Sequence, residues 1–293
     1  MTEPILGRLI TAMVTPFDAE GTVDLVRAQQ LAARLVDEQR NDAVLVNGTT
    51  GEAPTTSDAE KADLVRSVKQ AVGDRAKVVA GVGTFDTEHS IELCRQAAAA
   101  GADGLLAVTP YYLLPPQDAL VAHFQTLASA TDLPMLLYDI PHRTGRPIET
   151  ASLLTLAGHP NIVGVKDAKN DIVGSAQVLA ATGLDYYAGD DAKLLPLLAI
   201  GAVGVVGTST HFSGRRTAEL IEAWLRGDPA EALRIYRTLL PVYTGVFATQ
   251  GVMMVKAGLA HQGFSVGGLR RPLMAAPAEL ASGFAAILDA TEL

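Results

Sequence analysis

A lysine at the end of an apolar run is the residue of this chain best suited to covalent chemistry. Lys166 closes residues 162–166 (sequence IVGVK), a pattern typical of a buried strand that carries one amine at its carboxyl end. Apolar surroundings disfavour an ammonium ion, so the pKa of the amine falls and a nucleophile forms near neutral pH. Such an amine can form a Schiff base with a carbonyl compound. A structural lysine whose amine reaches from the strand end to water is the alternative interpretation.

The preceding strand favours the chemical interpretation. Residues 134–138 (PMLLY) deliver the phenol of Tyr138 at the equivalent end, and Arg143 follows five residues later. Side chains at the carboxyl ends of parallel strands meet on one rim, so we expect the amine, phenol and guanidinium to lie together. The net charge of −9 repels acids in general, and Arg143 beside Lys166 would supply the local cation that an acid substrate needs.

Three glycine-containing turns have weaker signals. In residues 48–52 (GTTGE), glycines on both sides of Thr49 and Thr50 allow backbone N–H groups to turn toward a carboxylate, although a plain strand-to-helix connection is the alternative. Residues 81–86 begin like a dinucleotide fingerprint but have aspartate in place of its third glycine, so we interpret them as a loop. The glycines of residues 201–207 indicate close packing of a strand rather than a phosphate site.

Further residues on the same rim have structural interpretations. Tyr111 and Tyr112 precede the sequence LLPP, and this apolar loop predicts a subunit interface or a lid, or else rings that cap the core. Asp190 and Asp191 are expected to cap a helix. Asp167 follows the lysine but should point to the opposite side of its strand, where it has at most a structural or electrostatic role.

Composition excludes several classes of protein. With 48% hydrophobic and 19% charged residues in a chain of 293, a large core is expected, and the acidic charge disfavours nucleic-acid binding. The six histidines do not fall at metal-ligand spacing, which disfavours a metal-dependent enzyme. Cys94, the single cysteine, is expected to be a buried apolar residue. No apolar stretch predicts a membrane span or a signal core, so we expect a cytoplasmic protein.

The order of elements predicts the architecture. Eight strand-like runs alternate with helical patterns, at residues 9–14, 43–47, 77–81, 104–109, 134–138, 162–166, 185–189 and 203–208. Continuous apolar strands of this kind predict a parallel (β/α)8 barrel, with an open doubly wound sheet as the alternative. Helical segments around residues 215–225, 229–248, 251–261 and 277–288 follow. We therefore predict a catalytic barrel over residues 1–225 and a C-terminal helical domain over residues 226–293.

Together these motifs resemble a known family. Residues 48–52 (GTTGE), 109–112 (TPYY), 138–145 (YDIPHRTG), 164–167 (GVKD) and 189–191 (GDD) are similar, in this order, to those of the dihydrodipicolinate synthase family. That family belongs to the pyruvate-dependent class I aldolases, which include N-acetylneuraminate lyase. The resemblance implies a barrel with a C-terminal helical domain, a homotetramer built from dimers, and condensation of pyruvate with aspartate semialdehyde on the route to lysine and diaminopimelate.

The resemblance also implies roles for particular residues. Lys166 would form the imine with pyruvate, Tyr138 would transfer protons through a relay that includes Thr49, and Tyr112 would enter the site of a neighbouring subunit. Arg143 would receive the carboxylate of aspartate semialdehyde. The remaining substrate-binding residues would be Thr50, the backbone near Val206, and Gly189. No metal or organic cofactor is implied, since the imine itself serves as the electron sink.

Two stretches depart from the family pattern. Enzymes of this family that lysine inhibits carry histidines after the GTTGE turn, and asparagine and glutamate after the third strand. Here residues 57–61 read SDAEK and residues 84–89 read TFDTEH, so the resemblance does not extend to feedback by lysine. Residues 207–211 (GTSTH) also differ in detail, which leaves the acceptor preference open.

Three functions other than the synthase are compatible with parts of the sequence. A related lyase could act on another 2-keto acid such as a sugar acid, but Arg143 favours the semialdehyde. A pyruvate-binding sensor or assembly protein could keep the fold without turnover, and only a covalent adduct separates it from an enzyme. A pyridoxal-phosphate enzyme is disfavoured because the sequence offers no convincing phosphate cradle.

Overall fold

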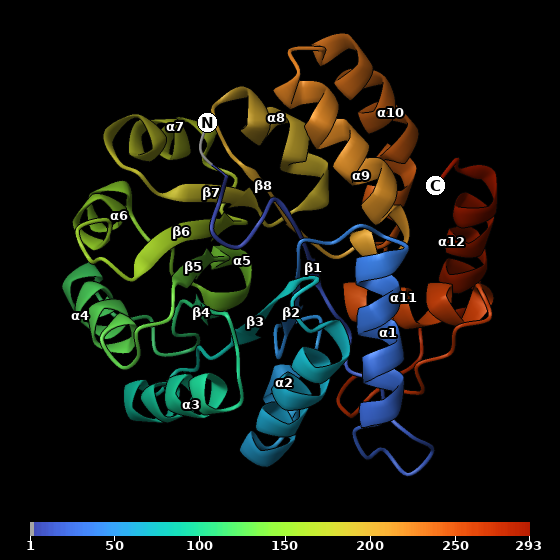
Figure 1. Ribbon diagram of the computed structural model, residues 1–293, viewed down its shortest axis with the longest axis horizontal. Coiled ribbons are helices and arrows are strands. Elements are labelled where there is room, and N and C mark those ends of the chain that lie inside the picture. Colours follow the sequence, from blue (N-terminus) through green and yellow to red (C-terminus); the bar gives the residue numbers. More distant parts are fainter. Residues whose placement is uncertain (1–2) are drawn as a thin grey trace.

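In the computed structural model, which describes residues 3–293, the strands close into a parallel barrel surrounded by helices (Figure 1). The strands are β1 (Leu9–Ala12), β2 (Ala43–Val46), β3 (Lys77–Gly81), β4 (Gly104–Val108), β5 (Met135–Asp139), β6 (Ile162–Asp167), β7 (Asp185–Ala188) and β8 (Gly204–Gly207). Each predicted strand forms, with ends that differ by at most two residues. Strand β8 pairs with β1, so the alternative of an open sheet is wrong.

The helices follow the strands in turn and then continue alone. The helices around the barrel are α1 (Leu25–Asp37), α2 (Asp58–Val72), α3 (Thr87–Ala99), α4 (Gln117–Ala128), α5 (Pro141–Thr144), α6 (Thr150–Leu156), α7 (Ile172–Ala181), α8 (Leu194–Ala199) and α9 (Thr210–Leu225), with short 3-10 helices η1 (Ala53–Thr55) and η2 (Asp191–Lys193). The chain ends with α10 (Pro229–Gly245), α11 (Gly251–His261) and α12 (Ala278–Ala290). All four predicted C-terminal helices form, and the first begins at Thr210, earlier than predicted. The division into two domains at residue 225 stays a prediction.

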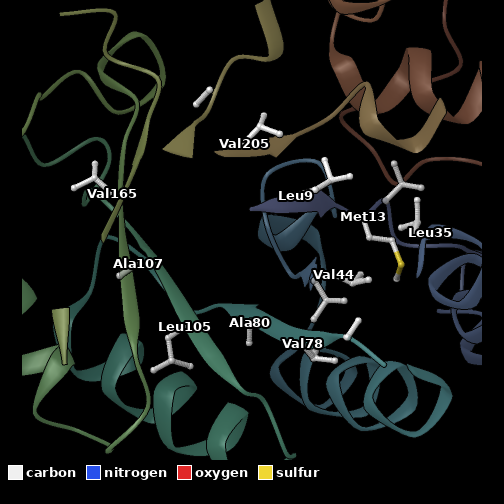
Figure 2. Close-up of a cluster of buried hydrophobic side chains, with 14 of the residues drawn as sticks. Leu9, Met13, Leu35, Val44, Val78, Ala80, Leu105, Ala107, Val165 and Val205 are labelled. Carbon is white, nitrogen blue, oxygen red and sulfur yellow. The ribbon is translucent and has the colours of Figure 1, made fainter. Parts of the chain in front are cut away.

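Alternate residues of each strand face opposite layers, which explains the continuous apolar runs. One layer lies between strands and helices (Figure 2) and includes Val44, Val78, Leu105, Val165 and Val205. Their neighbours Leu45, Val79, Leu106 and Val206 belong to a separate cluster inside the barrel. Because both faces are buried, a parallel barrel strand shows no polar alternation in sequence. Within residues 3–293, no helix combines the length and apolarity needed to span a bilayer.

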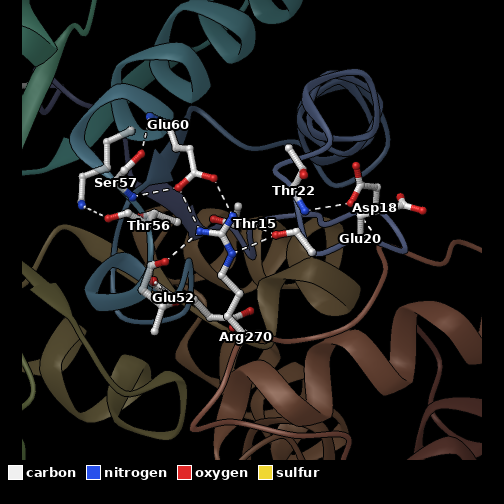
Figure 3. A network of polar contacts seen from close by, with 12 residues as sticks. Thr15, Asp18, Glu20, Thr22, Glu52, Thr56, Ser57, Glu60 and Arg270 are labelled. Atoms are coloured by element: carbon white, nitrogen blue, oxygen red, sulfur yellow. Dashed lines mark hydrogen bonds and ion pairs between the residues drawn. The ribbon is translucent and has the colours of Figure 1, made fainter.

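Polar contacts tie the C-terminal segment to the turn after β2 (Figure 3). The guanidinium of Arg270 donates to the carboxylate of Glu60, at 2.9 Å between Nη1 and Oε2, and to the backbone oxygens of Gly21 and Thr55. The backbone N–H of Arg270 donates to Oε2 of Glu52 at 2.9 Å. These contacts join segments more than 200 residues apart in the sequence.

A buried ion pair strengthens this connection. Nζ of Lys256, on α11, lies 2.8 Å from Oε1 of Glu52, and the two side chains are 3% and 1% exposed. The same amine donates to the backbone oxygen of Gly268 and lies 4.3 Å from the ring centre of Phe17. Glu52 has a φ of +56°, a left-handed conformation that non-glycine residues rarely adopt. The turn that carries Glu52 is therefore held by long-range contacts as well as by its local sequence.

This ion pair gives a stability prediction. Lys256→Met should lower the free energy of unfolding by about 3–5 kcal/mol, because it leaves the Glu52 carboxylate buried without a counter-charge. The double variant Glu52→Gln with Lys256→Met should recover most of this loss, since no unpaired charge remains. Urea denaturation of the three proteins measures both effects. Equal stability of the single variant and the wild type would contradict the prediction.

Candidate active site

Tyr138 and Lys166 are paired neighbours inside the barrel. Their Cα positions are partners in the parallel register of β5 and β6, and Nζ of Lys166 lies 4.2 Å from the ring centre of Tyr138. The next pair in register, Asp139 and Asp167, faces the opposite layer, where Asp167 accepts a hydrogen bond from the Ser175 hydroxyl at 2.5 Å. The expectation that Asp167 points away from the amine is confirmed.

The Lys166 amine is buried in a way that changes its acidity. The residue is only 5% exposed. Burial lowers its pKa from 10.5 to about 8; the negative charge of Asp191 opposes this shift, and the positive charge of Arg143 adds to it. Desolvation disfavours the ammonium form and leaves a usable fraction of free amine near neutral pH. This is the perturbation that the apolar run predicts.

The phenol of Tyr138 has the opposite shift. Burial raises its pKa, while the charge of Arg143 and a hydrogen bond with Thr49 lower it in part. The phenol therefore stays protonated at neutral pH, so it can donate a proton to a neighbouring group. The amine and the phenol differ in acidity but share one enclosed position.

A cavity of about 390 Å³ opens in front of these two groups. It is lined by Thr49, Thr50, Tyr138, Ile140, His142, Arg143, Lys166, Ala168, Asn170, Gly189, Asp190, Ala192, Thr208, Tyr243, Thr244 and Phe247. Six of the eight predicted site residues are among them; Tyr112 and Val206 are the exceptions. The hydroxyls of Thr50 and Thr208 lie 3.4 Å apart and link the ends of β2 and β8. The prediction of one shared rim is confirmed for amine, phenol and guanidinium.

The two exceptions occupy different places. Val206 lies on β8 in the cluster inside the barrel. Tyr112 is 89% exposed and has a φ of +74°. Its loop is fixed nevertheless, because Arg146 donates to the backbone oxygen of Leu114 at 3.1 Å. Tyr112 therefore does not line the cavity of its own chain, and its side chain is accessible to another molecule.

The acidic pair after β7 is only partly as predicted. Asp190 caps η2 by accepting from the backbone N–H of Ala192, as expected. The capping prediction is wrong for Asp191, which is 1% exposed and accepts from the backbone N–H of Thr208 at 3.0 Å and from the Ser209 hydroxyl at 2.6 Å. It turns inward because these donors come from the end of β8. Asp191 thus fixes the rim and places a negative charge near Lys166.

Other contacts qualify the remaining predictions. The backbone N–H of Gly189 already donates to the oxygen of Asp167 at 2.7 Å, so it is not free for a ligand.

Tyr243 and Phe247, from α10 and the segment after it, close one wall of the cavity, and sequence reasoning missed them because no local pattern marks them. Cys94 is buried as expected, and burial raises its pKa to about 12.

A second cavity, of about 540 Å³, shares Thr49, Tyr138 and Arg143 with the first. It is also lined by Asp58, Lys61 and His89, from the two stretches that depart from the family pattern, which therefore meet in space. Asp58 lies 2.9 Å from Nε2 of His89 and 3.7 Å from Nζ of Lys61. In residues 3–293, no three histidine, cysteine, aspartate or glutamate side chains gather as a metal site would require.

Comparison with known proteins identifies close relatives of the chain. The model of the dihydrodipicolinate synthetase family matches residues 5–291. The 4-hydroxy-tetrahydrodipicolinate synthase of Cutibacterium acnes is 59% identical over the full length of both chains. Dihydrodipicolinate synthase from Cyanidioschyzon merolae with lysine bound has a TM-score of 0.96 at 39% identity, covering 98% of each chain. The chloride-inhibited enzyme from Acinetobacter baumannii complexed with pyruvate has a TM-score of 0.93 at 30% identity, covering 97% of this chain and 98% of its own.

Removing the buried amine should abolish adduct formation and stabilise the fold. Lys166→Met cannot form a Schiff base, so borohydride with a 2-keto acid should leave it unmodified. It should also gain about 3 kcal/mol of stability at pH 7, because the folded protein no longer has to bury an ammonium whose pKa falls from 10.5 to about 8. The gain should shrink between pH 8 and 10.5, where the native amine loses its proton before the unfolded one does. Thermal unfolding of the variant and the wild type at pH 7 and at pH 10.5 tests this. A variant less stable than wild type at pH 7 would contradict it.

The pKa of Lys166 also predicts the pH dependence of the first step. Trapping of a 2-keto acid at short times should speed up about tenfold per pH unit below pH 8, because the free amine increases in that proportion, and level off above it. Mass spectrometry of borohydride-quenched samples measures the rate. A rise that continues to pH 10 would mean that the amine is not perturbed.

Proposed function

The chain belongs to the dihydrodipicolinate synthetase family, and we propose that the cavity in front of Lys166 is where it condenses pyruvate with aspartate semialdehyde. It is a 4-hydroxy-tetrahydrodipicolinate synthase, a lyase of lysine and diaminopimelate biosynthesis. The observation that carries the proposal is the pairing in register of a buried amine of lowered pKa with a protonated phenol. Schiff-base chemistry needs a nucleophilic amine and a proton donor in this arrangement.

In the first half of the reaction, the free amine of Lys166 attacks the ketone carbon of pyruvate. The oxygen leaves as water after protonation, and Tyr138, whose ring centre lies 4.2 Å from the amine, would supply that proton. Thr49, hydrogen-bonded to Tyr138, would reprotonate it. Thr50 and the backbone near Val206 would hold the pyruvate carboxylate.

In the second half, the imine acts as an electron sink. Loss of a proton from the methyl group gives an enamine, whose carbon attacks the aldehyde of the second substrate. The amino group of that substrate then displaces Lys166 from the imine carbon, which closes the ring and regenerates the enzyme. These reaction steps require no metal and no organic cofactor, and we propose that none is used.

Arg143 is proposed as the acceptor site. Its guanidinium lines the same cavity as Lys166 and can bind a carboxylate through two parallel hydrogen bonds. A lyase for another 2-keto acid remains the second candidate, but relatives that match between 92% and 100% of this chain are named as 4-hydroxy-tetrahydrodipicolinate synthases.

Assembly and location extend the proposal. Tyr112, Leu113 and Leu114 are 89%, 61% and 45% exposed, a surface that a second copy of the chain would cover. We propose that Tyr112 completes the proton relay of a neighbouring subunit in a homotetramer made of two dimers. A cytoplasmic location is proposed as well.

A single variant separates the two substrates. Arg143→Ala should still trap pyruvate on Lys166 under borohydride but lose about 100-fold in kcat/KM for aspartate semialdehyde, because a charge-assisted pair is removed. Trapping followed by peptide mass spectrometry reports the first step, and a coupled turnover assay reports the second.

The matched control is Arg66→Ala, because Arg66 is an exposed arginine on α2 paired with Asp63. It should behave as wild type in both assays. Wild-type protein that traps no pyruvate would overturn the proposed function, and equal losses of both steps in Arg143→Ala would make Arg143 structural rather than an acceptor site.

A further inference from the structure

Helix α11 touches the active site at its first residues although it belongs to the C-terminal segment. Gln250 is the N-cap of α11, and its side-chain oxygen accepts a hydrogen bond from Nη2 of Arg143 at 3.0 Å. Among residues 3–293, this is the one hydrogen bond that the guanidinium of Arg143 makes. The contact joins residues 107 positions apart, so only the folded chain brings them together.

The position of Arg143 explains why a hydrogen bond to Gln250 would be needed. It lies in α5, a helix of four residues, and its long side chain is exposed at the rim. An arginine in this position has many rotamers, and ordering it only when the substrate arrives would cost binding free energy. A hydrogen-bond acceptor that is already in place reduces that cost before the substrate binds.

The start of α11 lies against Thr208, which lines the cavity. A Cβ atom added at Gly251 would lie 3.3 Å from a side-chain carbon of Thr208, so the start of the helix abuts the end of β8. Farther along, Lys256 forms the buried ion pair with Glu52, which directly follows the turn that carries Thr49 and Thr50. Gln250 therefore lies at the start of a helix that is anchored to the segments after β2 and β8 through Glu52 and Thr208.

We propose that Gln250 is a positioning residue that holds Arg143 in its acceptor-binding orientation, with α11 as the rigid support. The inference rests on the proposed function, since it assigns the purpose of the Arg143 orientation to the second substrate. Gln250 acts through Arg143.

The test compares two glutamines of the same helix. Gln262, the C-cap of α11, accepts from Nη2 of Arg34 at 3.0 Å, the same bond to an arginine that does not line the cavity. Gln250→Ala should raise KM for aspartate semialdehyde about tenfold with little change in kcat, because a hydrogen bond to a charged group is lost. Pyruvate trapping on Lys166 should keep its wild-type rate. Gln262→Ala should match wild type in all three measurements.

A double-mutant cycle makes the test specific. If Gln250 acts through Arg143, then Gln250→Ala should add little to the KM effect of Arg143→Ala. A wild-type KM in Gln250→Ala, or full additivity with Arg143→Ala, would overturn the inference. Absence of a pyruvate adduct in the wild type would instead overturn the proposed function, so the two failures are distinguishable.

Discussion

The chemistry proposed for this protein depends on keeping one lysine ammonium away from water. A buried cation is unfavourable. Because the Lys166 amine has no close counter-ion among the described residues, its burial lowers its pKa. Asp191 is near enough to oppose the shift, but its carboxylate is committed to donors from the end of β8. Burial and the negative charge of Asp191 together determine the pKa of the amine. Near neutral pH the amine is therefore present in both its protonated and its free form.

A closed parallel barrel supplies the geometry that this balance requires. Side-chain alternation places Lys166 inside and Val165 outside, and the register with β5 places Tyr138 beside the amine. A shift of one residue in β6 would move the lysine to the layer under the helices and remove the site. Interior packing by Val206 and its neighbours therefore serves catalysis, because it fixes the register from which the amine projects.

Some of the residues with a strained backbone lie close to the site. The described non-glycine residues with positive φ include Asn47 and Glu52 on both sides of the threonine turn, Tyr112 after β4, and Asn170 after β6. Such conformations cost free energy and persist only when surrounding contacts determine them. For Glu52 those contacts come from α11 and the segment after it, through Lys256 and Arg270. The C-terminal helices thus support the turn that carries Thr49 and Thr50 from a distance, in addition to closing the cavity.

The sequence by itself determined the strands, their parallel class and the residues at their carboxyl ends. These features are local, since apolar runs, turn residues and the period of a strand are written in neighbouring positions. The lysine, phenol, arginine and the two threonines of one rim could be assigned in this way, and the family motifs agree with them. Only the tertiary structure decided what depends on residues far apart in the chain. It turned Asp191 inward, brought Tyr243 and Phe247 over the cavity, and joined Glu52 to Lys256 and Arg143 to Gln250. No local pattern encodes these contacts, because each joins segments that meet only when the barrel closes and the C-terminal helices pack onto it.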